Sequence, residues 1–176
     1  MFKKIVIILS TLVLVSIIGC SSSGDADLSK VNDEVRKLIS LSEIPKIDDL
    51  DIKEIVVKNG LETDKLQRNT VIITYTDKKG ELEKQEAYDK SIKLLYGPYE
   101  GDKVFTLSVS EIEAEFSHNM ETIMINGLEL LHTQLNDNLL IYTRHNGLSY
   151  TTEARITNKY TKDKQFEFFS QAVTYN

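Results

Sequence analysis

The three histidines are the side chains of this sequence best suited to acid–base chemistry near neutral pH. His118, His132 and His145 are 14 and 13 residues apart, so no two of them have the close spacing typical of zinc ligands. The chain contains no H-E-x-x-H, no G-x-S-x-G and no glycine-rich phosphate loop. We expect His132 to be buried on the strand face that carries Leu128 and Leu130, and His145 to be exposed in a turn. The histidines therefore predict no metal site.

Two groups of carboxylates could bind a cation or transfer protons: Glu111, Glu113 and Glu115, and Asp48, Asp49 and Asp51. The glutamates alternate, which predicts one face of a strand. Calcium needs oxygen ligands that converge from a tight loop, so a solvated strand face or a charged sheet edge is the simpler interpretation. A Ser-His-Asp triad can assemble from distant positions, but nothing in the sequence favours one. The sequence thus predicts no catalytic, cofactor-binding or metal-binding residue, and a protein that is not an enzyme.

Tyrosine is frequent: the chain has eight tyrosines and no tryptophan. Tyrosine offers a large contact area at a low entropy cost, which suits binding surfaces. It also suits half-buried strands, and both interpretations stay open. Tyr96 and Tyr99, on either side of Gly97-Pro98, are expected to form an exposed pair.

The only cysteine, Cys20, follows an apolar run and precedes three serines. Lys3 and Lys4 give the N-terminal region before this run a positive charge. The run Ile5–Ile18, 14 residues long, is shorter than the roughly 20 residues of a membrane-spanning helix. It has the length of a signal-peptide core.

The end of this run, Ile17-Ile18-Gly19-Cys20, resembles the lipobox of bacterial lipoproteins. The resemblance implies that residues 1–19 are a signal peptide and that Cys20 carries a diacylglyceryl group, with palmitate-type chains. Two acyl chains give stable anchoring, to which each buried methylene contributes roughly 0.8 kcal/mol. The alternatives are an ordinary secretory signal with an incidental cysteine, or an uncleaved N-terminal anchor.

Length and charge describe the rest of the chain. Residues 20–27 are small and polar, which predicts a flexible tether, and residues 28–176 are long enough for a single domain with its own core. The formal net charge of the whole chain is −6, and removing Lys3 and Lys4 makes it more negative. Lysines and arginines form no basic stripe, so nucleic-acid binding is not expected.

Helices are predicted at both ends of the domain. Ser29–Leu41 has Ser29 as a potential cap and one apolar stripe at helical spacing. Lys162–Tyr175 can be capped by Thr161, and Phe166 and Phe169 share a face. The N-terminal stripe is expected to cover the domain's own core, and Phe168 to be buried on a second side of the C-terminal helix.

Strands are predicted between these helices from period-two alternation and turn residues. Three turn signals recur about every ten residues and indicate a meander: Asn126-Gly127, Asn136-Asp137-Asn138 and Asn146-Gly147. The segment Glu81–Asp89 is ambiguous between strand and helix, and its setting favours strand. The other strands are expected at 52–57, 70–76, 91–96, 103–110 and between these turns up to Ile156. The predicted fold is α+β: a curved antiparallel sheet of six to nine strands, with the helices on one face.

The segment "INGLELLHTQLNDNLLIYTRHNGLSYTTEARI", followed by "TKDKQFEFFSQAV", resembles the end of an uncharacterised domain of Firmicutes lipoproteins and anti-sigma-factor-like proteins. The earlier "VIITYTD" and "IKLLYG" resemble tyrosine-bearing strands of that family. Arg144-His145 stands where the family usually has a tryptophan or an acidic residue. The resemblance implies an extracytoplasmic accessory or sensory domain and provides no catalytic residues.

Together these features predict a lipoprotein on the outer face of the cell membrane, as in a Gram-positive envelope. It would be held by the lipid on Cys20 and act as a non-catalytic interaction or sensing module with an envelope protein partner. One alternative is a carrier that encloses a lipid or another apolar ligand in a half-barrel cavity. Another is a hydrolase of wall or peptide substrates. An apolar cavity would favour the carrier, a polar cleft with converging carboxylates or histidines the hydrolase, and a filled core the interaction module.

Overall fold

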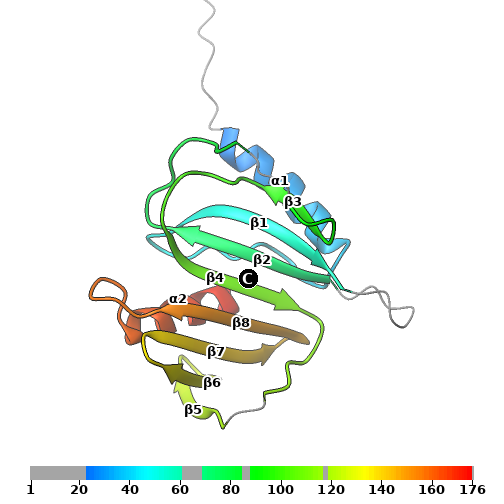
Figure 1. The fold of residues 1–176 in the computed structure, drawn as a ribbon. Coiled ribbons are helices and arrows are strands. Elements are labelled where there is room, and N and C mark those ends of the chain that lie inside the picture. Colours follow the sequence, from blue (N-terminus) through cyan, green and yellow to red (C-terminus); the bar gives the residue numbers. More distant parts are fainter. Residues whose placement is uncertain (1–22, 61–68, 85–87, 117–118, 176) are drawn as a thin grey trace, which may run out of the picture.

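One antiparallel sheet of eight strands, with a helix near each end of the chain, makes up the computed structural model (Figure 1). It describes residues 23–60, 69–84, 88–116 and 119–175; for 23–27 it describes the backbone alone. The predicted signal peptide, Cys20 and His118 lie outside these residues. The helices are α1 (Ser23–Arg36) and α2 (Lys162–Thr174). The strands are β1 (Asp51–Asn59), β2 (Asn69–Thr76), β3 (Ile92–Tyr96), β4 (Lys103–Ser110), β5 (Glu121–Ile125), β6 (Leu128–Leu135), β7 (Asn138–His145) and β8 (Leu148–Arg155).

The strand order is β3-β1-β2-β4-β8-β7-β6-β5, so the sheet has two halves. The first four strands form one half and the last four form a meander. The halves join where β4 pairs with β8, with Val109 opposite Tyr150. The segment 111–120 therefore leads from the middle of the sheet to its far edge, where β5 begins.

Local turn chemistry produces the predicted meander. Asn126, Asn136 and Asn146 have φ values of 51°, 55° and 49°, and Gly127 and Gly147 have φ values of 82° and 81°. Asparagine and glycine tolerate this left-handed conformation, which the tight turns of type I′ hairpins require. Each turn thereby fixes the register of the two strands that it joins.

The core lies on one face of the sheet, between the strands and the helices. Along β2, Val71, Ile73 and Tyr75 are fully buried on this face, as the alternation predicts. A single apolar cluster joins side chains of the strands to those of both helices. In Figure 1, α2 lies against the sheet at β4 and β8, and α1 lies beside the edge strand β3.

Helix α2 agrees with its prediction. Thr161 caps it by accepting a hydrogen bond from the backbone N–H of Lys164. Phe168, at 1% exposed, is buried between Phe105 and Tyr160 rather than serving as a surface anchor. The helix is thus enclosed on two sides.

Helix α1 begins six residues earlier and ends five residues earlier than the predicted helix 29–41. Its first turns include part of the predicted tether. Its apolar residues Val31 and Val35 are buried against the core, and Ile39, just after the helix, is buried as well. The helix ends early because the chain turns back over it. Asn32 accepts a hydrogen bond from the backbone N–H of Ile44 at 2.8 Å, and Arg36 donates one to the carbonyl of Ser42 at 2.6 Å.

The prediction of a strand at Glu81–Asp89 was wrong for its described residues. They contain one isolated β-bridge, between Leu82 and Tyr99, and no strand. The Leu82 side chain is 64% exposed. With no apolar face to bury, this segment gains little from joining the sheet.

Candidate functional site

The fold does not bring His132 and His145 together. His132 lies opposite Ile141 in the β6–β7 pairing, and His145 lies four residues further along β7. His145 is half-buried as the last residue of β7, rather than exposed in the following turn. Four residues of strand place the backbone of His145 about 13 Å along β7 from the position opposite His132, so the two histidines do not form a shared metal site.

His132 is 5% exposed, on the core face with Leu128 and Leu130 as predicted. Its Nε2 lies 3.7 Å from a carboxylate oxygen of Glu121, and its Nδ1 makes no hydrogen bond with a described residue. Burial lowers the pKa of His132 and the Lys162 charge lowers it further, whereas Glu121 opposes them. The environment therefore favours a neutral imidazole.

The predicted glutamate strand is wrong, because β4 ends at Ser110 and residues 111–116 form a loop. The chain has to leave the sheet here in order to reach its far edge. Glu111 accepts hydrogen bonds from the hydroxyl and the backbone N–H of Ser40, which lower the pKa of Glu111. Glu113 pairs with Arg144 at 2.9 Å. These two carboxylates attach the loop to the domain and do not converge on one point.

Asp48, Asp49 and Asp51 are exposed as predicted. Across the part of the chain that the structure describes, no group of three or more histidine, cysteine or acidic side chains could hold a metal ion. Asp49 has a φ of 64°, in the turn that leads into β1. The three aspartates nevertheless belong to a pocket that the sequence did not reveal.

Tyr96 and Tyr99 form a pair, with ring centroids 5.2 Å apart, but the predicted exposure is wrong. Tyr96 is 4% exposed and Tyr99 is half-buried. The ammonium of Lys79 lies 3.8 Å from the centre of the Tyr99 ring and 4.9 Å from that of Tyr96, and donates a hydrogen bond to the Tyr96 hydroxyl. Contacts of a cation with aromatic faces are favourable and hold Lys79 against both rings.

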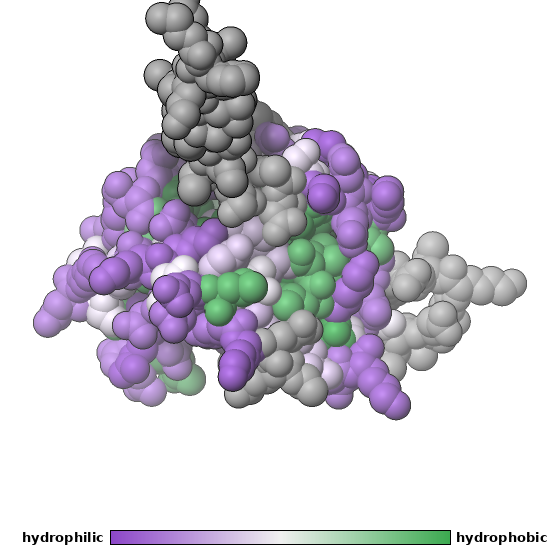
Figure 2. Space-filling model, turned by 90° about the horizontal axis from the view of Figure 1, so that it is seen from above, coloured by the Kyte–Doolittle hydropathy of each residue, from purple (hydrophilic) through white to green (hydrophobic). Residues whose placement is uncertain are grey.

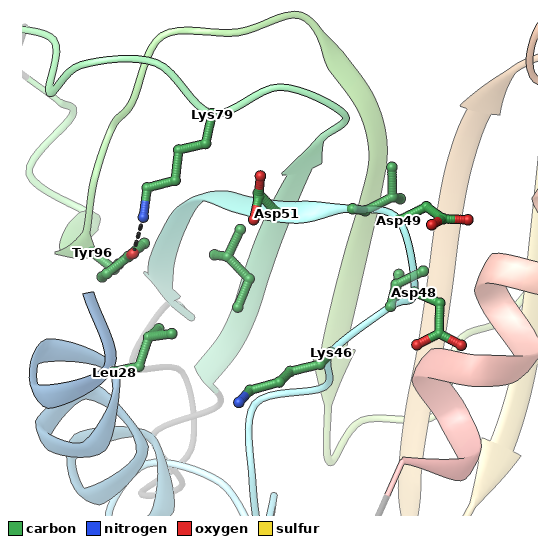
Figure 3. Close-up of a pocket in the computed structure, with 10 residues that line it drawn as sticks. Leu28, Lys46, Asp48, Asp49, Asp51, Lys79 and Tyr96 are labelled. Atoms are coloured by element: carbon green, nitrogen blue, oxygen red, sulfur yellow. Dashed lines mark hydrogen bonds between the residues drawn. The ribbon is translucent and has the colours of Figure 1, made fainter. Parts of the chain in front are cut away.

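A pocket of about 430 Å³, which we call the Lys79 pocket, lies beside this cluster (Figure 3). Its lining comes from α1, the turn before β1, the start of β1, the loop after β2 and the end of β3. The apolar members are Leu28, Ile47, Leu50 and Ile52, and the polar members are Lys46, Asp48, Asp49, Asp51, Lys79 and Tyr96.

The charges of the Lys79 pocket are arranged unevenly. In Figure 3 the ammonium group of Lys79 lies at Tyr96, at the end of β3, and that of Lys46 points toward α1 at a separate part of the pocket. The carboxylates of Asp48 and Asp49 point toward α2, away from the lysines, and Asp51 lies between the two groups. The pocket can therefore offer positive and negative charge at different points around an apolar floor.

A second hollow, the Leu135 groove, has a volume of about 520 Å³ and lies at the ends of β6, β7 and β8. Lys103 and Glu153 contribute opposite charges to it. Leu135 is 74% exposed there. The opposite end of the molecule, at α1 and β3, is mostly hydrophilic, with hydrophobic patches between the charged residues (Figure 2).

Comparison with known proteins gives no further guide, because no family model, curated protein or solved structure matches this chain. Within the described residues, neither helix has the length and apolar character needed to cross a bilayer.

The sequence did not predict that the residues of the Lys79 pocket would lie together. Leu28, Lys46, Lys79 and Tyr96 come from four separate segments. Their nearness depends on the pairing of β3 with β1 and on the position of α1 beside β3. The sequence singled out the tyrosines beside Gly97-Pro98 and the carboxylates Asp48, Asp49 and Asp51 separately, and only the fold brings them to one pocket.

Proposed function

We propose that the chain is a lipoprotein anchored by a diacylglyceryl group on Cys20 to the outer face of the cell membrane. In this proposal it acts there as a non-catalytic interaction or sensing module with an envelope protein partner. The lipobox Ile17-Ile18-Gly19-Cys20 supports the anchor. Helix α1 begins at Ser23, three residues after Cys20, so the folded domain would lie within about 10 Å of the acylated residue.

The filled core is the observation that favours an interaction module. Phe105, Leu130, Phe168 and Phe169 are each at most 1% exposed between the sheet and the helices. A carrier of this architecture would hold its apolar ligand in that space, and native cores are packed too densely to admit one. The hollows lie instead at the surface, as in the Lys79 pocket, where a module that binds other molecules would present them.

The anchor is tested with Cys20→Ala, and Ser21→Ala is the matched control. We expect C20A to lose incorporation of labelled palmitate and to leave the membrane fraction, or to remain unprocessed, whereas S21A behaves as wild type. Retention of C20A in the membrane at the processed size would contradict the anchor.

The non-catalytic role is tested by changing His118, His132 and His145 together to glutamine. A general acid or base typically contributes about 10²–10⁴-fold in rate, so an enzyme that used one of these histidines would lose its activity in the triple variant. A non-catalytic module needs none of them, and we expect the triple variant to complement a deletion strain when its abundance is matched to wild type. A folded, anchored and abundant variant without biological activity would favour the hydrolase.

The partner of the interaction module is identified by crosslinking and affinity capture from membranes. The C20A variant should no longer capture this partner.

A further inference from the structure

The Lys79 pocket has a preorganised positive group at its wall. The N–H of Tyr99 donates to the carbonyl of Lys53 at 3.1 Å, which attaches the tyrosine turn to β1. At Gly97, φ is 75° and a Cβ would stand 2.3 Å from the same carbonyl, so the turn lies directly against the strand. Lys79 is then held by the two tyrosine rings. A group fixed before binding loses little entropy when a ligand arrives.

Two further charged side chains line this pocket. Lys46 and Asp51 both line the pocket, and neither forms an ion pair with a described residue. Asp48 and Asp49 point elsewhere. The pocket thus presents two ammonium groups at separate points, Lys79 at Tyr96 and Lys46 beyond Leu28, and one carboxylate, Asp51 (Figure 3).

The rest of the lining is apolar, with Leu28, Ile47, Leu50 and Ile52 between the charges. A volume of about 430 Å³ lies within the usual range for small-molecule sites. A ligand with only a negative charge would be repelled by Asp51, and a ligand with only a positive charge would be repelled by both lysines. A molecule that carries both charges on an apolar body avoids either conflict.

We propose that the Lys79 pocket binds a small zwitterion with an apolar body, either a free amino acid or a short peptide. Its carboxylate would lie at the preorganised Lys79, its ammonium at Asp51, and its side chains on the apolar floor. The proposal rests on the sensing role proposed above, for which it names the class of molecule sensed.

Calorimetric titration of the full chain in detergent tests this with three forms of one dipeptide. Leu-Leu carries both charges, N-acetyl-Leu-Leu lacks the ammonium, and Leu-Leu amide lacks the carboxylate. We expect Leu-Leu to bind with a dissociation constant on the order of 0.1–1 mM, given the efficiency of ligands of this size. Each blocked form should bind about tenfold more weakly or worse, since hydrogen bonds to charged groups are strong. A parallel titration with leucine shows whether the pocket binds a free amino acid or requires a short peptide.

Variants locate the site. Asp51→Asn should remove the preference for Leu-Leu over its N-acetyl form, and Lys79→Gln should reduce the preference over the amide. Lys103→Gln and Glu153→Gln make the same chemical changes in the Leu135 groove and should leave all three affinities unchanged. Equal thermal unfolding of the four variants would exclude a folding defect.

Three results would overturn the proposal: no binding of Leu-Leu or leucine at about 10 mM, equal affinity for the charged and blocked forms, or equal effects of the variants in the two hollows. The purified chain is used, so a negative titration leaves the Cys20 anchor unaffected. Conversely, failure of the anchor would not alter a positive titration.

Discussion

The imidazole of His132 lies edge-on against the ring of Phe166, with their centroids 5.1 Å apart. This contact joins β6 to α2 inside the core and keeps the imidazole away from water. Because burial lowers the pKa of His132, the folded chain resists protonation more than the unfolded chain does.

The stability of the domain should therefore fall below neutral pH. An unfolded histidine titrates near pH 6.5, so the contribution of neutral His132 is fully present above that pH and is lost as the pH falls toward the lower folded-state value. We expect the free energy of unfolding in urea to decrease between pH 7.5 and 5.5, by at most about 1.4 kcal/mol per pH unit for one proton.

His132→Gln should flatten this dependence, and His145→Gln is the control for removal of an imidazole from the chain. The window stops at pH 5.5 because Glu34, Asp77 and Glu111, whose pKa values are lowered in the folded chain, lose their contribution to stability as the pH falls below that and through their ordinary values of 4.5 and 3.8. An undiminished slope in H132Q would show that another group is responsible.

Tyr75→Phe should destabilise the domain through a single hydrogen bond. The Tyr75 side chain is fully buried, and its hydroxyl donates to the carbonyl of Pro45 at 2.8 Å. Removing the donor leaves a buried carbonyl unpaired, which costs about 1–3 kcal/mol of unfolding free energy in urea. Tyr150→Phe, at a buried tyrosine whose hydroxyl has no described hydrogen bond, should cost less than about 0.5 kcal/mol. Similar losses in both variants would argue against the role of the Pro45 contact.

Phe168→Ala should be among the most damaging changes on α2. The ring packs between Phe105 and Tyr160, so its loss leaves a cavity between the helix and the sheet and costs about 3–5 kcal/mol. Phe168→Leu should cost less, because it retains most of the buried volume. Urea unfolding followed by circular dichroism measures both. A loss of less than about 1 kcal/mol in F168A would contradict this packing.

Two glycines with similar φ values should respond differently to alanine. Gly147, with φ 81°, has open space where the methyl group of an alanine would stand, so Gly147→Ala should cost only the left-handed backbone strain of about 1–2 kcal/mol. Gly97→Ala adds a methyl 2.3 Å from the Lys53 carbonyl and should cost about 3 kcal/mol or more. Thermal unfolding compares them. In addition, G97A should weaken binding of Leu-Leu, whereas G147A should not; equal losses of stability would contradict the close approach at Gly97.

The sequence by itself determined the features that depend on neighbouring residues. The asparagine turns bend the chain through backbone conformations that their own residues favour, so the meander and its register could be predicted. The alternation along β8 and the Thr161 cap of α2 are local in the same sense. The strand prediction at 103–110 coincides with β4 for this reason.

Only the tertiary structure decided features that depend on distant segments. Whether Glu111 and Glu113 continue a strand depends on where β5 pairs, and that is set at the far edge of the sheet. The burial of Tyr96 requires its packing against Tyr99 and Lys79, and the Lys79 pocket requires α1 beside β3. These contacts join residues up to about seventy positions apart, and their free energy depends on which surfaces the whole chain brings together. No local pattern of residue types carries that information.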